Sequence, residues 1–251
     1  MKLLTMLNLA GRWLLDDPTM SSVSKTGARY KSGPEAEDRV VRVVVAAIHE
    51  HRLSPGSRLI ERELAEAADA GRMAVRNGLR RLSEAGLVDL SPNRGATVMQ
   101  WSQGDMEQIF EARIINEEAA LLKLAGQMTD DHRVRLETIV REECAAYDEG
   151  HIEIARHLSR RFHMTFTELA GNSLIARFVK DLIDCQPLLS SGRAGRASSF
   201  SGTAAHIKTL AALVRGDGAE AASVNTALLR SLQSELALDR PRDGKGSKPH
   251  S

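Results

Sequence analysis

The stretch LAEAADAGRMAVRNGLRRLSEAGLVDLSPNRGATV, residues 64–98, decides the fold of this 251-residue chain. Within it, Arg72, Arg76 and Arg80 follow one another at helical i, i+4 and i+8 spacing, so their guanidinium groups form one stripe. No acidic residue between Arg72 and Arg81 neutralises that stripe. An apolar stripe lies beside it on the same helix and consists of Val75, Leu79 and Leu82. A short, basic, one-sided helix of this kind fits the major groove of DNA.

The residues around this helix divide into short elements with clear breaks. The periodic pattern predicts a first helix that starts at Asp38 and ends before Pro55-Gly56, a second over 59–68 and a third over 71–85. Gly86 stands where a helix C-cap glycine belongs. Residues 87–98 then predict a small β-hairpin. Three helices and a hairpin in about 60 residues are typical of a winged helix-turn-helix domain.

The chain after Trp101 is helical in pattern almost to its end. Ser102 and Asp105 form a capping-box pair, and Thr129 is a second N-cap candidate. We expect an all-α bundle of about six helices, with breaks near 171–172, 190–202 and 216–218, so that the whole chain is mainly α. The predicted organisation is a flexible arm over 1–36, a winged helix-turn-helix domain over 37–100, a helical domain over 101–238 and a disordered tail over 239–251.

Composition restricts the classes of protein that fit. The formal net charge is only +1, so any nucleic-acid partner must be held by a local patch. Aromatic residues make up 4% of the chain and hydrophobic residues 42%, which suits a core of packed aliphatic helices. Two distant cysteines, Cys144 and Cys185, favour a reducing cytoplasm over a disulfide framework. No apolar run reaches the roughly 18 residues of a membrane span. The first residues lack the pattern of a secretory signal, and Met20 is an alternative to Met1 as the native start.

The first half of the chain resembles the DNA-binding domain of GntR-type bacterial transcription regulators. The resemblance rests on the Pro55-Gly56 turn and on four further groups at the family's spacing: Leu64-Ala65, Val75-Arg76, Leu79-Arg80-Arg81-Leu82 and Gly86-Leu87-Val88, followed by Arg94-Gly95. The chain departs from the family at Ala70, Gly71, Met73 and Ala74, where relatives usually carry Val-Ser before the arginine and Thr-Pro after it, and at Asn77-Gly78. We expect the missing capping serine and the new Gly78 to weaken the helix by about 1 kcal/mol each.

The second half resembles the FCD effector domain of the fatty-acid-regulator branch of that family. The resemblance rests on Phe162-His163, Ala170-Gly171-Asn172, His206 and Gly216-Asp217 followed by Ala221-Ala222. It implies a divalent metal held by one Asp and three His. Here His163 and His206 match two of these ligands, whereas Ser159 and Leu228 replace the other two. We therefore expect His163, His206 and Ser159 to line an effector cavity rather than to hold a metal.

Six residues are predicted to contact DNA. Arg72 and Arg76, nearest the start of their helix, are placed to read base edges, since Arg pairs bidentately with guanine. Arg62 and Arg80 are better placed for phosphates. Arg94 and Gly95 would form the tip of the wing, where glycine lets the backbone approach DNA closely.

Arg113 lies among apolar residues of the first helix of the bundle and needs an anionic partner there. Two partners fit, namely an effector carboxylate and Glu117 one helical turn further on.

Together, these features predict a homodimeric DNA-binding transcription regulator, a repressor that a small organic acid or related metabolite releases from double-stranded operator DNA. No catalytic motif is present. The one enzyme alternative is a metal-dependent hydrolase that uses His163 and His206. An RNA-binding protein is disfavoured because the basic region has no aromatic side chains for stacking.

Overall fold

The structure is a computed structural model that describes residues 32–91, 95–189 and 196–239. The chain divides into two compact units, and the boundary falls between Gln100 and Trp101.

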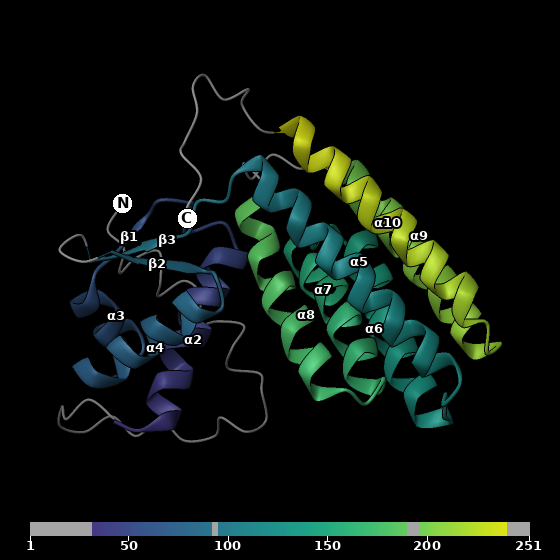
Figure 1. Cartoon of the computed structure of the whole chain (residues 1–251), viewed down its shortest axis with the longest axis horizontal. Helices are drawn as coiled ribbons and strands as arrows, with labels where there is room; N and C mark the ends of the chain where they lie inside the picture. Colours follow the sequence, from purple (N-terminus) through teal and green to yellow (C-terminus); the bar gives the residue numbers. More distant parts are fainter. Residues whose placement is uncertain (1–31, 92–94, 190–195, 240–251) are drawn as a thin grey trace. The chain divides into compact units, whose positions relative to one another are not determined.

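In its described residues, the first unit combines three helices with a small sheet (Figure 1). The strands are arranged in the order β1-β3-β2, and both pairs are antiparallel. Leu59 pairs with Ala96 at one edge, and Val88 pairs with Val98 at the other. The elements are α2 (Pro34–His49), β1 (Arg58–Leu59), α3 (Glu61–Ala67), α4 (Arg72–Glu84), β2 (Val88–Ser91) and β3 (Gly95–Val98).

Two boundaries in this unit differ from the sequence prediction. The first helix starts at Pro34, so residues 34–36 belong to α2 and not to a flexible arm. Proline suits the first turn of a helix because a backbone N–H there would have no partner within the helix. The negative charges of Glu35 and Glu37 are stabilising near the positive end of the helix dipole. The second helix starts at Glu61 rather than at residue 59, because Arg58–Leu59 pairs with β3 and turns the expected hairpin into a three-stranded sheet.

The second unit, over the ranges 101–189 and 196–239, contains six α-helices and a 3₁₀ turn. Helix α5 packs against α8 and α10, and α6 packs against α7 and α9 (Figure 1). Buried aliphatic side chains and the phenylalanines Phe110, Phe162 and Phe166 form its core. The elements are α5 (Gln103–Ala125), α6 (Asp130–Asp148), α7 (Ile152–Leu169), α8 (Ser173–Cys185), η3 (Gln186–Leu189), α9 (Arg196–Val214) and α10 (Gly218–Asp239).

Two predicted helix N-caps in this unit are confirmed. Ser102 and Asp105 form a complete capping box at α5. Thr129 accepts a hydrogen bond from the backbone N–H of His132 at the start of α6. Helix α9 begins at Arg196, within the stretch 190–202 expected to be a break, and α10 extends to Asp239. None of the helices within the described ranges is both long and apolar enough to cross a membrane.

Candidate functional site

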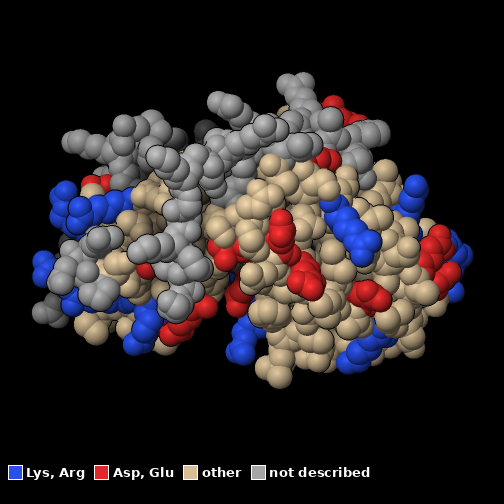
Figure 2. Space-filling view, turned by 45° about the horizontal axis from the view of Figure 1, so that its top comes forward, with Lys and Arg blue, Asp and Glu red and all other residues tan. Residues whose placement is uncertain are grey.

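Helix α4 presents its basic stripe to solvent. Arg72, Arg76 and Arg80 are all exposed, whereas the opposite face of the helix is buried. The buried face consists of Ala74, Val75, Gly78, Leu79 and Leu82. On the side of the molecule seen in Figure 2, the first unit, at the left, presents several Arg side chains. The charge pattern of α4 is therefore a surface feature supported by a packed apolar face.

The turn before α4 is held by a side chain from α2. Asp69 has a left-handed backbone with φ of 46°, a conformation that Asp tolerates better than most residues. Arg39 donates from Nε to the carbonyl of Ala68 at 2.9 Å and from its guanidinium to the carbonyl of Asp69 at 2.8 Å. These bonds satisfy carbonyls that the end of α3 leaves without partners. Arg39 thus fixes the position of α4 relative to α3.

Arg76 is paired with a residue at the start of α3. Its Nε lies 3.2 Å from both carboxylate oxygens of Glu61. Both side chains are well exposed, at 64% for Arg76 and 43% for Glu61. An exposed pair of this kind contributes about 0–1 kcal/mol. Arg76 is therefore oriented, but it is free to exchange Glu61 for another acceptor.

The other predicted contacts surround α4. Arg62 is exposed on α3, and Gly95 is exposed at the start of β3 with φ of 78°. No atom of the described residues would lie within 4 Å of a Cβ at Gly95, and the left-handed backbone there favours glycine. Arg94 lies outside the described residues.

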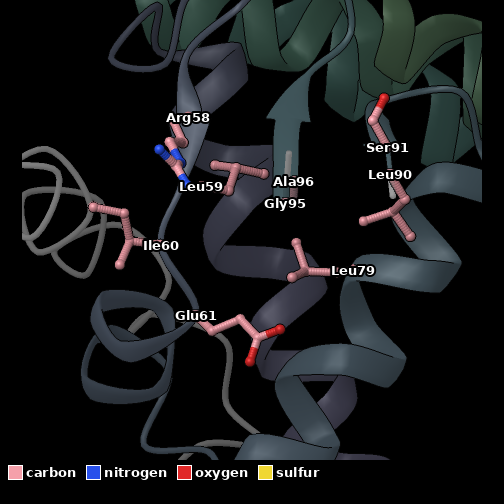
Figure 3. Close-up of a pocket in the computed structure, with 9 residues that line it drawn as sticks. All are labelled: Arg58, Leu59, Ile60, Glu61, Leu79, Leu90, Ser91, Gly95 and Ala96. Atoms are coloured by element: carbon pink, nitrogen blue, oxygen red, sulfur yellow. The ribbon is translucent and has the colours of Figure 1, made fainter. Parts of the chain in front are cut away.

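A groove of about 660 Å³ separates the sheet from helices α3 and α4 (Figure 3). Leu59, Leu79 and Ala96 contribute apolar surface, and Arg58 and Glu61 contribute charges. Ile60 and Leu90 also line it and are each about two-fifths exposed, at 42% and 41%. One of its lining residues, Glu61, is the ion-pair partner of Arg76 on α4.

The second unit contains a buried polar cluster that extends across five helices. Arg113 donates from Nε to Glu117 at 2.8 Å, as the sequence allowed, and its guanidinium also donates to Gln186. Glu117 lies 2.8 Å from His163 Nδ1, and Asn225 donates to the same carboxylate oxygen at 3.0 Å.

A second carboxylate completes the cluster. Glu143 lies 2.8 Å from Nδ1 of His206, and Thr203 donates to its other oxygen at 3.1 Å. The two imidazoles meet through their Nε2 atoms at 3.2 Å. The sequence analysis missed Glu143, Thr203 and Asn225, because their role depends on neighbours 60 or more residues away in the chain.

The protonation states follow from burial and charge. Burial alone would raise the pKa of Glu117, but the charges of Arg113 and His163 and the hydrogen bonds from His163 and Asn225 outweigh it and lower the pKa to about 2. Burial lowers the pKa of His163, although Glu117 opposes this. In the neutral form of His163, the Glu117 carboxylate favours the tautomer with its hydrogen on Nδ1, which leaves Nε2 as the acceptor that faces Nε2 of His206.

This donor set does not fit the four-ligand metal site that the family resemblance implies. Both Nδ1 atoms face carboxylates, so His163 and His206 offer only their two Nε2 atoms to a common point. Ser159 is half-buried, without a hydrogen bond from its side chain to the cluster, and Leu228 is an apolar core residue. Within the described ranges, no group of three or more His, Cys, Asp or Glu side chains is arranged to hold a metal ion. Structural zinc takes four such ligands and catalytic zinc usually three.

Known proteins with similar sequences fall in one class. Residues 36–98 match the family described as "Bacterial regulatory proteins, gntR family", and residues 108–231 match the FCD domain. The chain is 24% identical over 149 residues to the uncharacterized HTH-type transcriptional regulator YdfH of Escherichia coli O6:H1, covering 59% of this chain and 65% of that protein. It is also 24% identical over 144 residues to the HTH-type transcriptional repressor RspR of Escherichia coli K12, covering 57% and 63%. The matches thus span slightly less than two thirds of these relatives.

Solved structures show the same fold. E. coli McbR/YncC superimposes with a TM-score of 0.74 at 18% identity, over 82% of this chain and 99% of that chain. A putative GntR regulator from Rhodococcus sp. RHA1 gives 0.70 at 18% identity, over 83% and 100%. The two family matches, over residues 36–98 and 108–231, include the arginine-bearing helix α4 and the buried polar cluster. The chain belongs to the GntR family of bacterial regulatory proteins and carries an FCD domain.

Proposed function

We propose that the protein is a ligand-responsive repressor that binds operator DNA through residues 37–100 and binds its effector through residues 101–238. The observation that carries the DNA-binding part is the exposed stripe of Arg72, Arg76 and Arg80 on a helix whose other face is fixed by packing. A helix held in this way can enter the major groove without rearrangement of the domain.

The arginines have different roles in this proposal. Arg72 and Arg76 lie in the first two turns of α4 and read guanine edges. Arg62 and Arg80 contact phosphates, and Arg94 with Gly95 approaches the backbone or the minor groove from the wing. Arg58, at the edge of the groove in Figure 3, is placed to neutralise a further phosphate.

Replacement of Arg76 by alanine tests this assignment. Loss of one bidentate guanine contact should weaken binding to a selected operator duplex by about 1–3 kcal/mol, measured by fluorescence anisotropy at one salt concentration. Arg81→Ala is the matched control, because it removes the same charge from the same helix at a position outside the basic stripe, where the side chain pairs with Asp38 of α2 at 2.7 Å. Equal losses in both variants would show that only bulk charge matters.

The proposed assembly is a homodimer on a pseudo-palindromic operator. Helices α5 and α8 pack together and expose large apolar side chains, among them Ile115, Leu122, Leu174 and Phe178. Leu174 and Phe178 are 67% and 48% exposed, an unfavourable state unless a partner covers them. Sedimentation equilibrium should therefore give twice the mass of the chain, and Phe178→Glu should shift the equilibrium toward the monomer.

The proposed effector is a small organic acid or related metabolite bound near the buried polar cluster. Arg113 is the fixed cation there, and an entering carboxylate would compete with Glu117 and Gln186 for it, while Ser159, His163 and His206 lie on the neighbouring helices. Repression is supported by the name of one relative, a transcriptional repressor.

A thermal-shift screen of small carboxylates, followed by a DNA-release assay with each hit, tests both parts. A ligand shifts the equilibrium toward release only if it binds the DNA-free form more tightly. A hit that stabilises the protein but leaves the DNA complex intact would contradict release.

The hydrolase alternative is less well supported. His163 is 3% and His206 0% exposed, and their rings contact each other at 3.2 Å instead of facing a space for substrate. Metal analysis of the native protein, with His163→Ala and His206→Ala beside it, distinguishes the two functions, since the hydrolase needs a metal that either variant loses.

A DNA-binding regulator acts where the chromosome lies, so we place the protein in the cytoplasm.

A further inference from the structure

Helix α4 exposes one large apolar side chain among its arginines. Met73, the second residue of the helix, is 66% exposed. Its neighbours Ala74 and Val75 are 2% and 0% exposed, so α4 has a packed face available nearby for apolar residues. An exposed methionine gains nothing from the fold at this position.

Helical geometry places Met73 on the same side as the basic stripe. Successive residues of a helix turn by about 100°. Met73 therefore points between the directions of Arg76 and Asn77, one turn further on, and close to the direction of Arg80, two turns further on. The buried residues of α4 lie on the opposite side. The thioether therefore stands within the surface that would face DNA, close to the N-terminal end of the helix.

The chemistry of the major groove offers this side chain a specific partner. Methionine cannot neutralise a phosphate or pair with a polar base edge. The 5-methyl group of thymine is the apolar group that base pairs present in the major groove. An unbranched, flexible thioether adapts to such a small apolar contact.

We infer that Met73 is a specificity-determining residue that contacts the 5-methyl group of a thymine next to the bases read by Arg72 and Arg76. This inference rests on the proposed DNA-binding function and adds to it a preference for thymine over cytosine, and over uracil, at one position of each half-site.

The experiment begins with a duplex selected by the wild-type protein from a random pool. Each thymine of that duplex is then replaced, one at a time, by deoxyuridine, which keeps the hydrogen bonds and lacks only the 5-methyl group. Binding is measured by fluorescence anisotropy at one salt concentration. We expect one thymine per half-site at which the replacement weakens wild-type binding about fourfold, the effect of one buried methyl group.

The same duplexes are then measured with two variants of Met73. In Met73→Ala the effect of deoxyuridine at that thymine should disappear, whereas Met73→Leu, which keeps an apolar contact, should retain most of it. Val134→Ala is the control, because Val134 is a similarly exposed apolar residue, at 51%, on α6 of the other unit. Thermal unfolding of each variant verifies that the fold is intact.

The possible failures are distinguishable. If the wild type shows no thymine at which the methyl group matters, or if Met73→Ala keeps the full effect, the inference is wrong while DNA binding stands. If the wild type enriches no duplex, the proposed function itself fails, and the role of Met73 with it.

Discussion

Replacement of Gly78 by alanine should destabilise the protein, although it improves helix propensity. In an isolated helix this change is worth about 1 kcal/mol of added stability. Here Gly78 is buried against α2, and a Cβ at this position would lie 2.8 Å from Cγ1 and 2.9 Å from Cβ of Val40. Carbon atoms normally approach to about 3.5–4.0 Å. The Cβ of a β-branched residue cannot rotate away, so α2 itself has to move.

The magnitude follows from these two opposed effects. Overpacking of a tight core costs about 1–3 kcal/mol, from which the gain in propensity is subtracted. We expect a net loss of about 1 kcal/mol, which corresponds to a decrease of about 4–8 °C in the melting temperature of a domain of this size. Urea and thermal unfolding of the full chain, followed by circular dichroism, measure it.

Two companion variants make the reasoning refutable. Val40→Ala removes the closer of the two contacts, so Gly78→Ala should be less harmful in that background. Gly104→Ala is the matched control, because Gly104 lies in the first turn of α5, where a Cβ would meet only the Ser102 hydroxyl oxygen at 3.9 Å. Stabilisation by Gly78→Ala in the wild-type background, as large as that from Gly104→Ala, would refute the argument.

Three further predictions follow from the geometry. Glu117 and His163 have lowered pKa values, so in acid the unfolded chain binds more protons than the folded one. The stability that these two groups contribute is therefore present above pH 6.5 and is lost as the pH falls. His163 accounts for the loss that begins below pH 6.5, and Glu117 for the loss from pH 4.5 down to about 2. Glu117 alone corresponds to about 3 kcal/mol, and a free energy of unfolding that stays constant from pH 7 to 3 would contradict this. Arg39→Ala should lower the stability of the first unit by about 1–3 kcal/mol, because two carbonyls lose their donor, and an unchanged urea midpoint would count against it. Arg62→Ala should weaken binding to all duplexes alike and reduce the slope of log K against log salt by about 1, whereas a loss confined to the operator would assign Arg62 to base contact.

Periodicity was sufficient to predict most helices of this chain. The stripes of α4 and the caps at Ser102 and Thr129 are local features, so the sequence alone predicts them. Strand β1 is different. It has only two residues, and it is a strand because Arg58 and Leu59 pair with residues of β3 almost 40 positions further on. No local pattern specifies such a partner.

The same distinction applies to the energetics and the site. The sequence suggested that Gly71 and Gly78 each weaken α4 by about 1 kcal/mol. In the structure Gly71 is the N-cap, where glycine costs only a few tenths relative to serine, and Gly78 makes room for Val40. The carboxylate partners of the histidines were likewise beyond sequence reasoning, because Glu117 and Glu143 reach His163 and His206 only through the packing of α5 and α6 against α7 and α9.

The pair between Arg76 and Glu61 shows how structure changes the meaning of the basic stripe. From the sequence, the stripe is an unneutralised charge, but in the folded unit its central arginine already has a carboxylate partner. Because both side chains are exposed, breaking the pair costs about 0–1 kcal/mol, whereas a bidentate contact with guanine contributes about 1–3 kcal/mol. Attraction to a DNA phosphate alone would not separate Arg76 from Glu61 on every duplex, whatever its base sequence. Glu61 therefore raises the threshold for non-specific engagement of Arg76, and release of that arginine is favoured where a guanine offers it two acceptors.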